Sequence, residues 1–137
     1  MIFIDTNVLS ESFRKIPDMR VAGWLARRDA ELALPTIVIA EIAFGIFRLP
    51  AAQRSPSHEQ KLSDWRNHFR NRIFGFTEEA ALAYGELMGR AKRQGVQMST
   101  ADGMIAAIAL ANGGRLATRN VDDFRATGLQ LVSPWDA

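Results

Sequence analysis

The chain has 137 residues, of which 47% are hydrophobic, and this is enough to form one core of ordinary domain size. Its net charge is only +2, and together with the apolar content this excludes a long disordered chain. Cysteine is absent, which excludes disulfides and thiolate metal sites.

Signals for membrane insertion or export are not found in the sequence. No apolar run approaches the roughly 20 residues that a helix needs to cross a bilayer. The N-terminus lacks the basic segment that precedes the apolar part of a secretory signal. Together with the absence of cysteine, this predicts a cytoplasmic protein without a membrane partner.

In its first half, the chain alternates short apolar runs with longer amphipathic segments. A short β-prone apolar run indicates a buried strand, and a longer run with helical spacing indicates a helix. Asp18 is a suitable N-cap for one helix, and Pro50 ends another. The expected strands are residues 2–4 and 31–35, and the expected helices are residues 6–13, a segment after Asp18, and residues 36–49.

The second half continues this alternation after a loop-like stretch at residues 51–60. We expect a helix beyond this loop, a long helix that begins at Thr77, and another that Ser99 opens and Gly113 ends. The expected strands are residues 72–76, 115–118 and 129–133. Short strands alternating with helices predict one α/β domain over residues 1–137, with a central, mainly parallel sheet. Ligands of such sheets bind outside the carboxyl ends of the strands.

Two carboxylates lie in apolar surroundings. Asp5 ends the first expected strand, and an Asp at such a place also serves as the N-cap of a following helix. Glu41 lies in PTIVIAEIAFGIFRL, whose even apolarity predicts a helix that is buried on all sides. Because a buried carboxylate is costly unless it is paired or binds a cation, Glu41 is either a ligand or the partner of Arg48 or another arginine.

Further acids follow toward the C-terminus. Asp102, in STADGM, fits a capping box behind Ser99, and its helical neighbours are apolar. Asp122 and Asp123 follow the strand expected at residues 115–118, and either of them can cap a short helix. Each acid therefore has a structural explanation, but all of them lie near the carboxyl end of a strand or on an apolar helix beside the sheet.

Carboxylates that converge repel each other and must take up protons or bind a cation. Without cysteine, and with both histidines in the polar middle of the chain, zinc is disfavoured, whereas an all-oxygen site suits Mg²⁺ or Mn²⁺. Such ions activate water and stabilise a phosphate during in-line displacement. Of the 17 basic residues 14 are Arg, which indicates either a nucleic-acid partner or a GC-rich genome. These features favour phosphodiester hydrolysis.

Four segments, in this order, resemble PIN-domain proteins, and among them the VapC-type toxins of bacterial toxin–antitoxin pairs. They are IFIDTNVLS, TIVIAEIAFG, STADGMIAAIAL and LATRNVDDF, and the closing VSPW resembles one branch of these toxins. The similarity spans essentially the whole chain. It implies a metal-dependent ribonuclease with a single PIN-like α/β/α sandwich.

The resemblance also implies roles for individual residues. Asp5, Glu41 and Asp102 match acids of the family's metal site, where Mg²⁺ or Mn²⁺ is the expected cofactor. Residues expected to hold these acids or a metal-bound water are Thr6, Asn7, Thr118 and Asn120.

The position of the fourth acid differs among proteins of this family. Some relatives place it where Asn120 stands, and others place it at the position of Asp123. Because Asn120 is not an acid, we expect Asp123 to be the fourth catalytic and metal-binding residue, with Asp122 as the alternative.

The expected partners follow from the same resemblance. They are an RNA substrate and a cognate antitoxin, and the expected assembly is a homodimer or a toxin–antitoxin hetero-oligomer. The small-residue segment 81–89 suits either an interface or the chain's own core. The alternative function is a catalytically silent PIN-fold module that binds RNA or protein, although the presence of all the acids argues against it. The expected RNA contacts are Arg48, Arg66, Arg70, Arg72 and Arg119.

Overall fold

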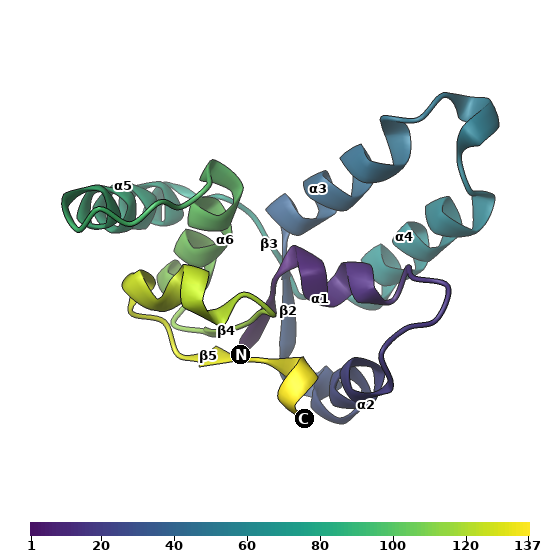
Figure 1. Cartoon of the computed structure of the whole chain (residues 1–137), viewed down its shortest axis with the longest axis horizontal. Coiled ribbons are helices and arrows are strands. Elements are labelled where there is room, and N and C mark those ends of the chain that lie inside the picture. Colours follow the sequence, from purple (N-terminus) through teal and green to yellow (C-terminus); the bar gives the residue numbers. More distant parts are fainter.

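The computed structural model describes all 137 residues and contains one five-stranded sheet in the order β3-β2-β1-β4-β5 (Figure 1). All neighbouring strands are parallel, which confirms the predicted α/β class with a parallel sheet. The parallel order also brings the carboxyl ends of β1 and β4 side by side. The strands are β1 (Ile2–Ile4), β2 (Leu32–Pro35), β3 (Ile73–Phe74), β4 (Arg115–Ala117) and β5 (Leu131–Val132).

Helices flank the sheet, as an α/β/α sandwich requires. In Figure 1, α5 and α6 lie on one side of the molecule, and α1 to α4 lie on the other. Helices α5 and α6 pack closely on each other, and α3 contacts both α4 and α6. The helices are α1 (Thr6–Glu11), α2 (Met19–Arg28), α3 (Thr36–Phe47), α4 (Pro56–His68), α5 (Glu78–Arg93) and α6 (Thr100–Ala111). None of them is both long and apolar enough to span a membrane.

The predicted helix ends are confirmed by their capping contacts. The side chains of Asp18, Thr77 and Ser99 each accept a hydrogen bond from a backbone N–H two or three residues further on. Gly95 and Gly113 follow the ends of α5 and α6 with φ angles of 70° and 64°. Residues with a Cβ atom rarely adopt this left-handed conformation, which explains the glycines at both positions.

The loop predicted at residues 51–60 is wrong in its second part. Residues Ala51–Gln53 form a single 3₁₀ turn, and α4 already begins at Pro56. Proline fits the first turn of a helix, because its missing N–H would have no partner there in any case. The polar stretch from Pro56 onward is therefore the start of a helix and not part of an extended loop.

The prediction that α3 is buried on all sides is also wrong. Its residues Val38, Ile42 and Ile46 face the core, whereas Phe44 and Phe47 are 70% and 51% exposed. An apolar sequence makes burial favourable, but the elements packed on a helix decide which face is covered. Glu41 lies on the uncovered part of α3 and is exposed.

The cap of α5 provides a test of these local contacts. We expect Thr77→Ala to lower the free energy of unfolding by about 1 kcal/mol, because the N–H of Ala80 loses its acceptor. Thr100→Ala, inside the first turn of α6 where the side chain caps nothing, is the matched control. Urea unfolding of both variants measures the difference, and equal losses would contradict the capping role.

Candidate active site

Asp5 ends β1 and is held from three directions. Its backbone N–H donates to the carbonyl of Ala117 at 2.9 Å, which continues the ladder between β1 and β4. Its carboxylate accepts hydrogen bonds from the backbone N–H of Thr6 at 2.8 Å, from Asn7 Nδ2 at 3.0 Å and from Thr118 Oγ1 at 2.7 Å. Asp5 is also the N-cap of α1, so the capping explanation is correct but incomplete, since two of these donors lie outside the cap.

Burial dominates the ionisation of Asp5. The residue is 3% exposed, and loss of hydration raises its pKa from 3.8 to about 6. The hydrogen bonds from Thr118 and Thr6 act in the opposite direction, and the charges of Asp102 and Glu41 raise the pKa further. Asp5 is therefore a fixed carboxylate whose negative charge a bound cation would stabilise.

The loop after β4 fixes the donors that hold Asp5. The hydroxyl of Thr118 is fully buried and accepts a hydrogen bond from the backbone N–H of Asn120 at 3.0 Å. Asn7 Oδ1 accepts from the backbone N–H of Arg119 at 3.1 Å, while its amide nitrogen donates to Asp5. The side chains of Thr118 and Asn7 each make two hydrogen bonds, and these bonds fix their orientation. Asn120 contributes its backbone, and its side chain makes no hydrogen bond to an acid.

Glu41 is linked to Asp5 through Thr6. The hydroxyl of Thr6 donates to Glu41 Oε1 at 2.5 Å, and the backbone N–H of the same residue donates to Asp5. Glu41 forms no ion pair with Arg48 or any other arginine. The hydrogen bond from Thr6 therefore directs the Glu41 carboxylate toward the start of α1. The burial that the sequence context suggested is not the cause.

Asp102 joins this group from α6. Its pKa is raised, first by partial burial and then by the charges of Glu41 and Asp123, while a hydrogen bond with Ser99 lowers it. Asp5 is likewise affected by the charges of Asp102 and Glu41. Four carboxylates from separate parts of the chain therefore act on one another electrostatically.

The two candidate residues for the fourth acid have different surroundings. The side chain of Asp122 is 86% exposed and forms an ion pair with Arg125 at 2.5 Å. Asp123 instead lines a hollow of about 810 Å³ together with Asp102. Of the two residues, Asp123 lies beside the other acids.

The donor chemistry of this group fits Mg²⁺ or Mn²⁺, since every candidate ligand is a carboxylate oxygen. In the conformation described, however, no three of the acids are close enough together to ligate one ion. Asp5 and Asp102 have raised pKa values, and a cation between the acids would offset the repulsion that contributes to them. The residues fit the ion chemically, and ligation requires their side chains to move closer together.

The predicted RNA contact Arg72 lies away from the acids. Its guanidinium donates to the carbonyl groups of Asp29 and Leu32, at 2.5 and 3.2 Å, and stacks on Phe69 at 4.8 Å. These contacts lie at the amino ends of β2 and β3, whereas the acids lie near the carboxyl ends of the strands. Arg72 therefore connects α4 to the sheet, and its position does not favour contact with a substrate at the acids.

The other predicted RNA contacts are exposed arginines. Arg119 stacks on Trp135 at 5.0 Å, and its backbone N–H bonds to Asn7, so it lies next to the site. Arg70 is held by Asn67 at 2.8 Å. The exposed predicted residues are Arg48, Arg66, Arg70 and Arg119.

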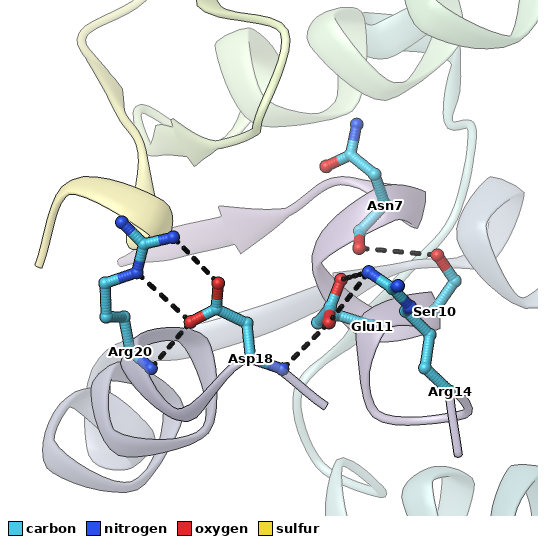
Figure 2. A network of polar contacts seen from close by, with 6 residues as sticks. All are labelled: Asn7, Ser10, Glu11, Arg14, Asp18 and Arg20. Carbon is cyan, nitrogen blue, oxygen red and sulfur yellow. Dashed lines mark hydrogen bonds and ion pairs between the residues drawn. The ribbon is translucent and has the colours of Figure 1, made fainter. Parts of the chain in front are cut away.

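A buried carboxylate that the sequence analysis missed is Glu11, at the end of α1. It is 4% exposed, accepts a hydrogen bond from the backbone N–H of Asp18 at 2.9 Å, and lies 3.4 Å from Arg14 (Figure 2). In Figure 2 the Asn7 side chain points away from this network. Glu11 therefore joins α1 to the start of α2 and is separate from the acids of the site. Its position three residues after the apolar Val8, on the same face of a helix, is the signal that was available in the sequence.

The raised pKa of Asp5 predicts how the stability of the metal-free protein depends on pH. Because the folded protein binds this proton more tightly than the unfolded chain, the contribution of Asp5 falls as pH rises from about 4 through about 6. We expect the melting temperature in EDTA to fall less steeply over this window for Asp5→Asn than for the wild type. Thermal melts at several pH values measure both slopes, and equal slopes would contradict the raised pKa.

Comparison with known proteins identifies relatives that match the chain over nearly its whole length. The family model described as PIN domain matches residues 2–129. "Plasmid stability protein StbB" of Pseudomonas syringae pv. tomato is 40% identical, with complete coverage of both chains. "VapC ribonuclease Y4jK" of Sinorhizobium fredii is 37% identical and covers 99% of each chain.

Solved structures of similar fold include proteins of the same kind as these sequence relatives. The crystal structure of FitAcB from Neisseria gonorrhoeae contains a chain that is 34% identical, with a TM-score of 0.91 and complete coverage of both chains. A chain in VapBC2 from Rickettsia felis, bound to a DNA fragment from their promoter, is 25% identical, with a TM-score of 0.83 and coverage of 97% and 98%. The chain belongs to the PIN-domain family, and within it to the VapC-type proteins.

Proposed function

We propose that this protein is a metal-dependent ribonuclease toxin of the cytoplasm, which hydrolyses RNA phosphodiester bonds and is neutralised by a cognate antitoxin. One observation carries the catalytic part: Asp5, Glu41, Asp102 and Asp123 come from separate parts of the chain, and their charges act on one another. The similarity to the Sinorhizobium fredii protein, a VapC ribonuclease, supports RNA as the substrate.

The proposed Mg²⁺ or Mn²⁺ ligands are these four carboxylates. When bound, such an ion activates water for attack and stabilises the charge of the phosphate. The chain's own part is to hold its acids in place: Thr118 and Asn7 orient Asp5, and Thr6 orients Glu41. Oriented ligands of this kind lose less conformational entropy when they bind an ion or a substrate.

The proposed antitoxin partner rests on the relatives and on the surface of the chain. VapBC2 of Rickettsia felis, one chain of which is 25% identical to this protein over nearly its whole length, was solved bound to a fragment of promoter DNA. Exposed apolar side chains lie on α3 and α5, and such side chains are typical of a surface that another chain covers. In the segment 81–89, Leu87 is buried while Leu82 is 69% exposed, so this segment serves the core with one face and offers the other to a partner. A hetero-oligomer or a homodimer would cover Phe44, Phe47 and Leu82.

A second candidate function is a catalytically silent PIN-fold module that binds RNA or protein. The observation in its favour is that no three of the acids are within reach of one ion in this conformation. A nuclease assay of the purified protein with Mn²⁺, Mg²⁺ or EDTA separates the two functions. Cleavage that EDTA abolishes would exclude the silent module, and binding of RNA without cleavage would favour it.

The two neighbouring aspartates allow a matched test of the proposed acid site. We expect Asp123→Asn to lower the rate of RNA cleavage by more than about tenfold, which corresponds to about 1.4 kcal/mol of barrier. Asp122→Asn should stay near the wild-type rate, because that carboxylate is paired with Arg125 on the surface. Cleavage of one RNA under single-turnover conditions with Mn²⁺ gives both rates, and the reverse order would assign the fourth position to Asp122.

Removal of the metal provides a second test, with stability as the readout. In EDTA, we expect Asp102→Asn to melt at a higher temperature than the wild type, because a carboxylate with a raised pKa is destabilising when charged. In millimolar Mn²⁺ the order should reverse, since an ion that binds only the native state stabilises it, and the variant has lost a ligand.

Asp122→Asn is the control for this melting experiment. Its side chain is exposed and lies outside the acid group, so metal should stabilise this variant and the wild type equally. An equal metal-induced shift for Asp102→Asn would remove Asp102 from the proposed metal site.

A further inference from the structure

A hollow of about 810 Å³ extends from Asp102 and Asp123 along the end of α5. Its lining combines apolar and polar groups: Met88, Val96 and Met98 are half-buried, whereas Lys92 is exposed. Two of the four proposed metal ligands thus line a space that extends well beyond them.

The wall of this hollow is a defined turn. Beyond α5, the N–H of Val96 donates to the carbonyl of Ala91 at 2.8 Å, and the N–H of Gly95 donates to that of Lys92 at 3.1 Å. With Gly95 at a φ of 70°, these two bonds form a Schellman motif. The turn is therefore held by its own backbone, so the backbone of Lys92 and Val96 has a fixed position at the rim.

Close packing between α5 and α6 fixes the floor. A Cβ atom on Gly103 would lie 2.7 Å from the Sδ atom of Met88 and 3.0 Å from a ring carbon of Tyr84. Gly103 thus allows Met88 to lie directly against α6. The thioether contributes a polarizable apolar surface of the kind that accommodates flat rings.

Charge is distributed unevenly around the hollow. Asp102 and Asp123 are on one side, and Lys92 forms no ion pair with any acid of the chain. An uncompensated ammonium group beside an apolar space suits a ligand with a flat apolar part and an anionic part. A nucleotide has both, and Gln97 adds an amide that can hydrogen-bond to the edge of a base.

We propose that this hollow is a nucleotide subsite, which receives one unstacked base of single-stranded RNA next to the bond that the acids cleave. In this subsite Met88, Val96 and Met98 contact the base, and Lys92 neutralises the adjacent phosphate. The proposal rests on the proposed ribonuclease function and deepens it. It implies a substrate class, unpaired RNA, because a base in a duplex must first leave its stack.

Binding of a fluorescent single-stranded RNA of about ten nucleotides, in EDTA so that metal-dependent cleavage is prevented, tests the subsite. We expect Lys92→Gln to weaken binding about five- to tenfold and to lower the slope of log K against log salt by about 0.7, the value for one phosphate contact on a single strand. Arg93→Gln is the matched control, because Arg93 is the exposed neighbour on α5 and does not line the hollow.

Two further variants separate the base contact from the phosphate contact. Met98→Ala should weaken binding with an unchanged salt slope, since it removes apolar surface only. Gln97→Glu should weaken binding through repulsion of the RNA, and both variants should melt close to the wild type. The wild type should bind the same sequence less tightly as a duplex. Equal affinities of Lys92→Gln and Arg93→Gln, or equal affinity for duplex and single strand, would overturn the proposal.

A cleavage assay with Mn²⁺ makes this failure distinguishable from failure of the proposed function. If the wild type cleaves RNA, and Lys92→Gln cleaves and binds RNA as well as Arg93→Gln does, the nuclease function stands and the subsite is excluded. If the wild type does not cleave RNA, but Lys92→Gln binds RNA more weakly than Arg93→Gln does, the RNA-binding subsite is supported and the nuclease function is excluded. Loss of binding to a partner protein alone, with RNA binding unchanged, would assign the hollow to that protein and overturn the proposal.

Discussion

Asp5 is bound at the carboxyl end of β1 by donors from α1 and from the loop after β4, and the rest of the site depends on this contact. Its N–H completes the ladder to Ala117, and its carboxylate receives the hydroxyl of Thr118 at 2.7 Å. The same donors fix the loop that leads to Asp123 and the first turn of α1, from which Thr6 reaches Glu41. The parallel β1–β4 pair therefore positions Asp5 and the loop that leads to Asp123.

The four acids differ in burial, and this makes their mutual repulsion tolerable. Asp5 is buried and Asp102 is partly buried, whereas Glu41 and Asp123 are exposed. Burial removes water from the two inner carboxylates and raises the pKa of both, and the charges of the neighbouring acids add to this effect. The inner acids are poorly hydrated, and Asp5 is fixed by its donors, whereas the outer acids are in contact with water.

The exposed side of α3 leaves apolar side chains in contact with water. Phe44 and Phe47 lie in solvent, although their helix is among the most apolar segments of the chain. The guanidinium of Arg54 lies 5.0 Å from the ring of Phe47, which covers part of that surface. The isolated chain therefore retains apolar area that its own fold does not bury, as a protein that works with a partner is expected to do.

The sequence by itself determined the α/β class, most helix ends and the order of the acids along the chain. These features depend on local chemistry: strand-forming runs, capping side chains such as Thr77 and Ser99, and glycines after helices. Tertiary structure alone decided which acids lie close to one another. Asp122 and Asp123 are equivalent in sequence, yet only Asp123 lies beside Asp102. Likewise, Glu41 looked buried from its neighbours, but burial depends on which elements cover α3. Distance and exposure arise from packing between segments far apart in the chain, and no local pattern encodes them.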